Sequence, residues 1–323
     1  MSTLTYADLL ALPRISDYLK RVEQRLADDV AWVGGSTAAT AAETLAAGGK
    51  RLRPLLVLLS SSTAGQSDEN LVRAGSAVEL VHMATLVHDD VLDHASLRRG
   101  RPTVWAQHGD LIAGATGDFL FARAFAVLAE TDDIDSLILL AQAALGLSEG
   151  EALQMLQTRR PETTPEQYFE RCTLKTGRLF AAACGLGGRL GGLGDADAKA
   201  LAEYGRLLGL AFQVADDILD CDGLSTATGK VLGTDLIGGT ATLPLLYAAR
   251  ADAEIAEALR HEPEPAAVLP LLARVGELGA IDEARDTARE LVRKAEEALD
   301  LITGDLDTTP LRMVVRGVVD RDT

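Results

Sequence analysis

Two short acidic patterns constrain this chain most: Asp89-Asp90-Val91-Leu92-Asp93 and Asp216-Asp217-Ile218-Leu219-Asp220. In an α-helix each residue turns by about 100°, so the first and last carboxylates of each pattern share one face, one turn apart. Clustered carboxylates repel one another and are costly at a half-buried site unless cations neutralise them. Oxygen ligands of this kind suit Mg²⁺, which proteins usually hold together with waters and substrate phosphates. The patterns therefore predict two helices that present carboxylates to Mg²⁺ and a diphosphate.

Apolar neighbours argue against the alternative of two solvated acidic helix faces. Val87 precedes the first pattern, and Phe212, Val214 and Ala215 precede the second. Solvated faces are not normally embedded in apolar sequence, so both segments are expected to pack against the protein interior.

Composition indicates an all-α protein that binds small anions. The 323 residues are 47% hydrophobic but only 4% aromatic, a profile typical of helical chains. A net charge of −17 excludes general nucleic-acid binding. Basic residues nevertheless gather at Lys50-Arg51-Arg53 and at Arg98-Arg99-Arg101, which we interpret as anion sites.

The chain is expected to be soluble and cytoplasmic. Its three cysteines show no Cys-x-x-Cys spacing and are interpreted as reduced, packed thiols. Residues 1–20 lack the features of a signal peptide, and no apolar run is long enough for a membrane span.

Helical periodicity runs from end to end, and no composition break marks a second domain. One domain over residues 1–323 is predicted, with the glycine-rich run Gly185–Gly194 as a loop. That run follows a helix, so it does not indicate a dinucleotide site. Helices are predicted at 5–31, 36–47, 52–64, 69–95, 103–130, 133–158, 164–188, 195–222, 241–260, 264–279, 281–303 and 308–320.

With both patterns placed, the sequence resembles the all-trans polyprenyl diphosphate synthases of the isoprenoid synthase superfamily. The motifs that carry the resemblance follow in one order along nearly the whole chain: Gly48-Gly49-Lys50-Arg51-Leu52-Arg53-Pro54, His82, His88 with the first pattern, Arg98-Arg99-Gly100, Gly117-Asp118, Glu149-Gly150-Glu151, Lys175-Thr176-Gly177, Phe212-Gln213 with the second pattern, Gly229-Lys230, Gly233-Thr234-Asp235-Leu236 and Thr242-Leu243-Pro244.

The resemblance implies a single-domain helical bundle around a deep central cavity, usually a homodimer. It implies Mg²⁺-dependent, head-to-tail condensation of isopentenyl diphosphate with an allylic diphosphate, with three Mg²⁺ ions per active site. Asp89, Asp93 and Asp216 would be direct metal ligands. Asp90, Asp217 and Asp220 would support them or bind through water, and Asp235 would lie in the outer layer.

The same resemblance assigns the remaining site residues. The allylic diphosphate would bind Arg98, Lys175 and Lys230, and isopentenyl diphosphate would bind Lys50, Arg53, His82 and Arg99. Lys175, Thr176 and Gln213 would be the catalytic set, with oxygen dipoles of Thr176 and Gln213 beside the transient allylic cation. The departing diphosphate would take the final proton. His88 remains either a site residue or a hydrogen-bonded core histidine, and Arg51 and Arg101 are left outside the primary site.

One position departs from the family pattern: Thr240 stands where many relatives carry a lysine that helps to hold the allylic diphosphate. Because the other charged positions are filled, a functional synthase is favoured over a non-catalytic subunit of a heteromeric synthase. A terpene cyclase is disfavoured by the intact second pattern and by Lys50 and Arg53. A helical scaffold without activity would not need these phosphate-binding cations.

Product length in this family depends on bulk just before the first pattern, where Ala84 and Thr85 are both small. The prediction is a product of about six to ten isoprene units, such as a quinone side chain, released at a membrane surface or to an accessory protein. The alternative is a short-chain synthase that makes farnesyl or geranylgeranyl diphosphate.

Overall fold

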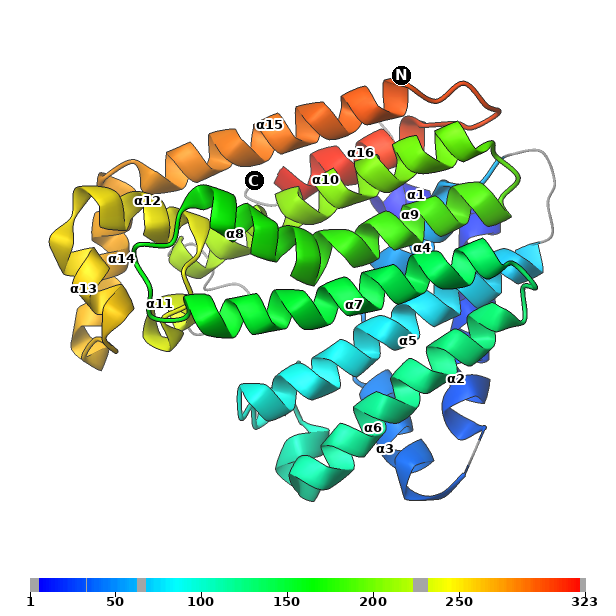
Figure 1. Cartoon of the computed structure of the whole chain (residues 1–323), viewed down its shortest axis with the longest axis horizontal. Coiled ribbons are helices and arrows are strands. Elements are labelled where there is room, and N and C mark those ends of the chain that lie inside the picture. The colour runs from blue at the N-terminus through cyan, green and yellow to red at the C-terminus, as the bar shows by residue number, and fades with distance from the viewer. Residues whose placement is uncertain (1–5, 33, 63–67, 223–231, 320–323) are drawn as a thin grey trace. The chain divides into compact units, whose positions relative to one another are not determined.

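The computed structural model describes residues 6–32, 34–62, 68–222 and 232–319, and helices make up almost all of its secondary structure (Figure 1). This confirms the predicted all-α class. The helices, in chain order, are α1 Tyr6–Ala11, α2 Pro13–Ala31, α3 Gly35–Ala46, α4 Leu52–Leu59, α5 Asp68–Leu92, α6 Val104–Ala129, α7 Ile134–Gln157, α8 Pro165–Cys172, the π-helix η1 Thr173–Gly177, α9 Arg178–Leu190, α10 Asp195–Cys221, α11 Thr234–Gly238, α12 Leu243–Ala251, α13 Ala253–Arg260, α14 Pro265–Glu277, α15 Ala280–Asp300 and α16 Thr309–Val319.

A small hairpin between α5 and α6 is the exception to the helical pattern. Strands β1 (Leu97–Arg98) and β2 (Arg101–Pro102) pair antiparallel. The turn residues Arg99 and Gly100 have φ values of 53° and 73°. Positive φ at both central residues matches the right-handed twist of the paired strands. Arg98 therefore stands at the end of β1, paired with Arg101, and Arg99 stands in the turn itself.

The chain divides into two compact units, each built from three segments. Unit 1 comprises Met1–Ala144, Leu179–Ala202 and Leu301–Met313; unit 2 comprises Leu145–Arg178, Glu203–Asp300 and Val314–Thr323. The boundary falls inside α7, α9, α10 and α16. The single domain remains a prediction, and the units are described separately below.

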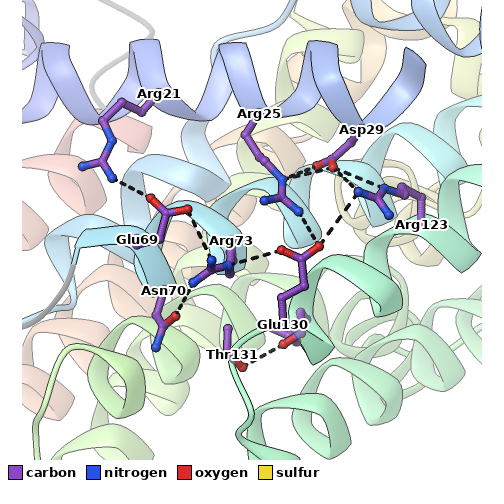
Figure 2. A network of polar contacts seen from close by, with 10 residues as sticks. Arg21, Arg25, Asp29, Glu69, Asn70, Arg73, Arg123, Glu130 and Thr131 are labelled. Atoms are coloured by element: carbon purple, nitrogen blue, oxygen red, sulfur yellow. Dashed lines mark hydrogen bonds and ion pairs between the residues drawn. The ribbon is translucent and has the colours of Figure 1, made fainter. Parts of the chain in front are cut away.

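Unit 1 is centred on α5 and α6, which lie side by side, with α2, α3 and α4 packed around them (Figure 1). An ion-pair network joins three of these helices (Figure 2). The buried Asp29 of α2 accepts hydrogen bonds from Arg123 of α6 (2.7 Å) and Arg25 (3.0 Å). Glu130 adds contacts to Arg25 (2.6 Å) and to Arg73 of α5 (3.4 Å). Since an unpaired buried charge would be costly, the network favours one register of these helices.

The prediction of a loop at Gly185–Gly194 is wrong for its first half, because α9 continues to Leu190. A Cβ at Gly187 would lie 2.2 Å from the carbonyl oxygen of Val57 in α4. A Cβ at Gly188 would lie 2.8 Å from a methyl group of Leu201 in α10. These glycines are therefore contact points between closely packed helices rather than chain-turning residues.

Unit 2 contains shorter helices around α12, which contacts α8, α13, α14 and α15. The predicted helix at 241–260 is interrupted at Asp252, whose side chain accepts from the backbone N–H groups of Glu254 and Ile255 and so caps α13. The predicted first helix is likewise interrupted before Pro13, which begins α2.

By length and composition alone, α6 and α7 are long and apolar enough to cross a membrane, although core helices of soluble proteins meet the same test.

Candidate active site

The first aspartate pattern begins in the last turn of α5, and its final residue, Asp93, directly follows the helix. Asp90 is buried and accepts from Nε (2.9 Å) and Nη2 (2.8 Å) of Arg98 on the hairpin. Burial raises the pKa of Asp90, and the charge of Arg98 partly opposes that rise. Asp89 is half-buried and Asp93 exposed. Asp90 thus turns inward, away from Asp89 and Asp93, whereas the spacing alone had placed it beside them.

A basic cavity of about 320 Å³ lies beside this pattern within unit 1. Four arginines from the hairpin and the α3–α4 loop line it together with His82 of α5: Arg51, Arg98, Arg99 and Arg101. Met83, Leu86 and Val104 supply apolar walls, and the lining also includes three acids: Glu43, Glu79 and Asp90. Its chemistry therefore suits a diphosphate attached to a short apolar group.

His82 enters this cavity as a neutral imidazole. Burial lowers its pKa well below the ordinary value, and the charges of Arg53, Arg99 and Arg98 lower it further. A neutral imidazole can still donate one hydrogen bond to a phosphate oxygen. Thr85 donates to the carbonyl oxygen of His82 (2.8 Å), while Ala84 is fully buried in α5.

The three basic residues at the start of α4 have different surroundings, which the sequence did not reveal: Lys50, Arg51 and Arg53. Lys50 is exposed, and the Arg53 guanidinium lies 4.6 Å from the ring centre of Phe180. Arg51, with a left-handed φ of 49°, reaches into the cavity lining and donates to Glu79 (2.9 Å) and Glu23 (2.5 Å). Of these three cations, Arg51, which sequence analysis left outside the primary site, is the one that lines the cavity.

His88 packs against α6 one residue before the first pattern. Its Nε2 lies 3.3 Å from the carbonyl oxygen of Gly114 and 3.6 Å from Asp118. A Cβ at Gly117 would lie 2.2 Å from that nitrogen, which explains the glycine of the Gly117-Asp118 motif. These contacts give His88 hydrogen-bonding partners on α6, although 33% of its side chain is exposed, so its role in the site stays a prediction.

In unit 2 the second pattern occupies the end of α10, and its second aspartate is again buried. Tyr168 of α8 donates to Oδ2 of Asp217 (2.6 Å), and Gln213 donates to Oδ1 (2.9 Å). Burial raises the pKa of Asp217 to about 6, against the lowering effect of these two hydrogen bonds and the charge of Arg171. Both oxygens of Asp217 are thus engaged within the protein.

The last aspartate of this pattern holds the chain that follows it. Asp220 accepts from the backbone N–H (3.2 Å) and hydroxyl (2.6 Å) of Thr234 and from the N–H of Asp235 (3.0 Å). The backbone of Asp235 is thereby placed next to Asp220, and its place in an outer metal layer stays a prediction. Asp216 is half-buried. Lys230, predicted to bind the allylic diphosphate, lies outside the described residues.

The predicted catalytic residues Lys175 and Thr176 lie in the π-helix η1. Such a turn often marks a functional site. Lys175 pairs with Glu151 of α7 at 2.5 Å, and Thr176 donates to Oε1 of Gln213 at 3.0 Å. A Cβ at Gly150 would lie 2.5 Å from the backbone nitrogen of Lys175, so only glycine lets α7 pass this turn. Thr176, Gln213 and Asp217 therefore form one hydrogen-bonded chain.

Among the described residues, no three His, Cys, Asp or Glu side chains are grouped closely enough to hold a metal ion by themselves. The donor set of Asp89, Asp93 and Asp216 nevertheless has the hard-oxygen chemistry of Mg²⁺, which commonly takes several of its ligands from water and phosphate. The metal ligands remain a prediction.

Comparison with known proteins settles the family. The sequence profile of Polyprenyl synthetase matches residues 36–272, well over half of the chain. This chain belongs to the polyprenyl synthetase family. The polyprenyl synthetases are prenyltransferases, so the protein is an enzyme of the trans-prenyltransferase class, as the resemblance of its motifs implied.

Individual relatives agree with this assignment. The chain is 38% identical to the octaprenyl diphosphate synthase of Haemophilus influenzae over 79% of each chain. It is 35% identical to the geranylgeranyl diphosphate synthase of Methanosarcina mazei, over 85% of this chain and 87% of that one. The crystal structure of a Caulobacter crescentus polyprenyl synthase, complexed with calcium and isoprenyl diphosphate, superimposes with a TM-score of 0.87 and 34% identity over the whole of both chains. Prenyl transfer is common to these relatives, whereas their product lengths differ.

Several side chains of this polyprenyl synthetase that support the site had no role in the sequence-based prediction. Tyr168 and Arg171 lie on the buried face of α8, where Tyr168 contacts Asp217, and Glu151 pairs with Lys175. The sequence before Lys175 has a helical pattern and places Tyr168 two turns before Lys175. It does not show that Tyr168 contacts Asp217. Thr240 is the position that differs from the family pattern. Next to it, the side chain of Arg159 packs against Gly239 and donates to the carbonyl oxygen of Ile237 (2.6 Å).

Proposed function

We propose that this enzyme is a Mg²⁺-dependent synthase that condenses isopentenyl diphosphate with an allylic diphosphate into an all-trans polyprenyl diphosphate of about six to ten isoprene units. The observation that carries the proposal is a basic cavity beside the first helix-borne aspartate pattern, lined by Arg98, Arg99 and neutral His82. A second helix of the chain carries an aspartate pattern of the same spacing. Each pattern supplies carboxylates for Mg²⁺, with up to three ions in the active site, and the cavity supplies the donors for a diphosphate.

In the proposed reaction the allylic C–O bond breaks, and its electron pair leaves with the diphosphate. When bound, Mg²⁺ would neutralise the charge that develops on that leaving group. Arg98, Lys175 and Lys230 donate to the same diphosphate. The double bond of isopentenyl diphosphate, held by Lys50, Arg53, His82 and Arg99, then attacks the allylic carbon, and the departing diphosphate accepts the proton released.

The hydrogen bond from Thr176 to Gln213 supports the role given to Thr176. Because the hydroxyl proton is directed at Gln213, the lone pairs of Thr176 Oγ1 remain available to face the transient allylic cation. The amide of Gln213 is in turn oriented by its bond to Asp217.

One assay tests the reaction and its product. The purified protein is incubated with Mg²⁺, labelled isopentenyl diphosphate and each allylic primer in turn, and the dephosphorylated products are sized. We expect products of about C30–C50 that depend on Mg²⁺. A product that stops at C15 or C20 would favour the short-chain alternative instead, and no product with any primer would favour the non-catalytic subunit.

The length assignment rests on small side chains before the first pattern. Replacing Ala84 by Phe should shorten the product sharply by filling the space that the growing chain needs. Because Ala84 is fully buried, Thr85→Phe at the neighbouring half-buried position serves as a second variant. Unchanged products from two folded variants would contradict the assignment.

Exposed apolar side chains on α7 support a homodimer. Ile134, Ile138, Leu145 and Leu156 recur along this helix, and Leu145 is 67% exposed. Apolar surface that recurs along one exposed helix commonly marks a protein contact. The charged substitution Leu145→Glu should shift the molar mass measured by light scattering from dimer to monomer, while Gln24→Glu at an exposed position of α2 should not. The enzyme would act in the cytoplasm and release its poorly soluble product at a membrane surface.

A further inference from the structure

Tyr168 is a fully buried phenol with a charged partner. Its ring is sealed in α8, and its hydroxyl lies 2.6 Å from Oδ2 of Asp217 in α10. A buried hydroxyl needs a hydrogen-bond partner, but most find a backbone carbonyl or a neutral side chain. Here the acceptor is the second carboxylate of an aspartate pattern, and a hydrogen bond to an ionised acceptor is among the stronger kinds.

This contact leaves the other oxygen of Asp217 to a single donor. Gln213 lies one helical turn before Asp217 and donates to Oδ1 at 2.9 Å. Because the amide nitrogen of Gln213 is committed to that bond, its carbonyl oxygen is turned toward Thr176, which donates to it at 3.0 Å. The hydroxyl of Tyr168, which also hydrogen-bonds Cys172 of the same helix, therefore joins α8 to a chain that runs through α10 to η1.

Arg171 makes this end of the chain rigid. Its guanidinium donates to Gln157 of α7 (2.8 Å) and to the carbonyl oxygen of Ala241 before α12 (2.8 Å). The same guanidinium lies 5.3 Å from the ring centre of Tyr168. The phenol is thus held between fixed elements, as is needed for a group that orients a site.

The helical geometry connects this anchor to the outward carboxylates. Asp216 and Asp220 are four residues apart and share one face of α10, whereas Asp217 is rotated away from them toward α8. A bond that fixes Asp217 therefore fixes the rotation of the last turn of α10, and with it the direction of Asp216.

We propose that Tyr168 is a positioning residue for prenyl transfer, which acts through Asp217 to set the direction of Asp216 and the orientation of the Gln213 amide. The inference rests on the proposed function, since it assigns Asp216 to Mg²⁺ and Thr176 to the reacting carbons. Without the hydroxyl, Asp217 loses one of its two donors, so the turn can rotate and the Gln213 amide can reverse.

The substitution Tyr168→Phe tests this with the loss of one oxygen atom. We expect the Mg²⁺ concentration for half-maximal rate to rise about tenfold and kcat to fall by a similar factor, as is usual when a group that orients a metal ligand is removed. The KM for isopentenyl diphosphate should stay unchanged. Calorimetric titration of Mg²⁺ with inorganic pyrophosphate provides a readout independent of turnover, and its affinity should weaken by the same factor.

Tyr18→Phe is the matched control. Tyr18 is equally buried, and its hydroxyl donates to the carbonyl oxygen of Leu71 at 3.0 Å, with no aspartate of either pattern involved. This variant should lose stability like Tyr168→Phe but keep the wild-type response to Mg²⁺. If both variants shift Tm equally and neither changes the Mg²⁺ response, Tyr168 has only a structural role and the inference is wrong.

A double-mutant cycle tests whether Tyr168 acts through Asp217. In Asp217→Asn the fold keeps an isosteric group at the acceptor position, and adding Tyr168→Phe to it should cost much less than tenfold further. Full additivity of the two effects would overturn the claim that Tyr168 acts through Asp217. If the wild-type protein neither turns over the substrates nor binds pyrophosphate with Mg²⁺, the proposed function itself fails, which the same titrations reveal.

Discussion

The two aspartate patterns share a spacing, but each buries its second carboxylate in a different way. On α5, Asp90 is paired with the charged guanidinium of Arg98, which comes from a hairpin a few residues later. On α10, Asp217 is held by two neutral donors, Tyr168 and Gln213. The same local sequence therefore supports one buried carboxylate by opposite charge and the other by neutral hydrogen bonds.

The difference indicates how each region can respond to a substrate. Arg98 is also a proposed donor to the allylic diphosphate, so its pairing with Asp90 must be shared or exchanged when that anion binds. Tyr168 and Gln213 carry no charge that an anion would draw away. We infer that the first pattern is built to rearrange with the substrate and the second to remain fixed.

The largest expected effect tests whether the two patterns are equivalent at their outward carboxylates. Asp89→Ala and Asp216→Ala should each lower kcat/KM by about 1,000-fold or more, because each removes charge that would hold Mg²⁺ at the leaving group. The exposed Asp28→Ala on α2 serves as the control, and circular dichroism should show unchanged helicity in all three. A loss below about tenfold in either variant would show that only one pattern serves the chemistry.

The next largest expected difference is in the stability cost of replacing two glycines by alanine: Gly150, which packs against η1, and Gly117, which packs against His88. A Cβ at Gly150 meets the backbone of Lys175 at 2.5 Å, whereas a Cβ at Gly117 meets the ring of His88 at 2.2 Å. The backbone cannot move without shifting η1, but the half-buried ring can rotate. In urea denaturation, Gly150→Ala should therefore cost about 3 kcal/mol and Gly117→Ala about 1 kcal/mol.

Gly114→Ala is the control for these variants, since nothing lies within 4 Å of its added Cβ. It should be neutral or slightly stabilising in the helix. Equal losses for Gly117→Ala and Gly150→Ala would contradict the distinction between a movable ring and a fixed backbone.

The pH dependence of stability tests whether burial beside neutral donors raises the pKa of Asp217. Its pKa in the folded protein, about 6, lies above the value of 3.8 expected when unfolded, so the folded state binds more protons between these values. This carboxyl therefore lowers the free energy of unfolding as pH rises through that window. In EDTA, wild type should lose about 2 kcal/mol relative to Asp217→Asn between about pH 4.5 and 7. A pH-independent difference between the two would show that Asp217 titrates in its ordinary range.

The smallest effect concerns salt. Asp90→Asn breaks a partly exposed ion pair and should cost about 1 kcal/mol at low ionic strength, falling to roughly half in about 1 M NaCl. The cost of Asp217→Asn should not change with salt, because the two hydrogen-bond donors that it affects are neutral. If both costs fall equally, the contrast between ionic and neutral support is wrong.

Much of this organisation could be predicted from sequence, within clear limits. The helices that carry both patterns were predicted to within a few residues, since apolar periodicity is a local property. The glycine run was mispredicted because its conformation depends on Val57 and Leu201, which are distant in sequence. Arg51 was set aside because the sequence does not show which of three adjacent cations turns toward a cavity.

By itself the sequence determined the family, the helical class and the face on which each pattern presents its first and last carboxylates. Those properties follow from spacing along one helix, where each residue has a fixed direction relative to its neighbours. Only the tertiary structure decided that Asp90 meets Arg98 and Asp217 meets Tyr168, and that η1 passes beneath Gly150. The reason is physical: the partner of a buried polar group depends on how helices from distant parts of the chain pack, and spacing within one helix carries no information about that.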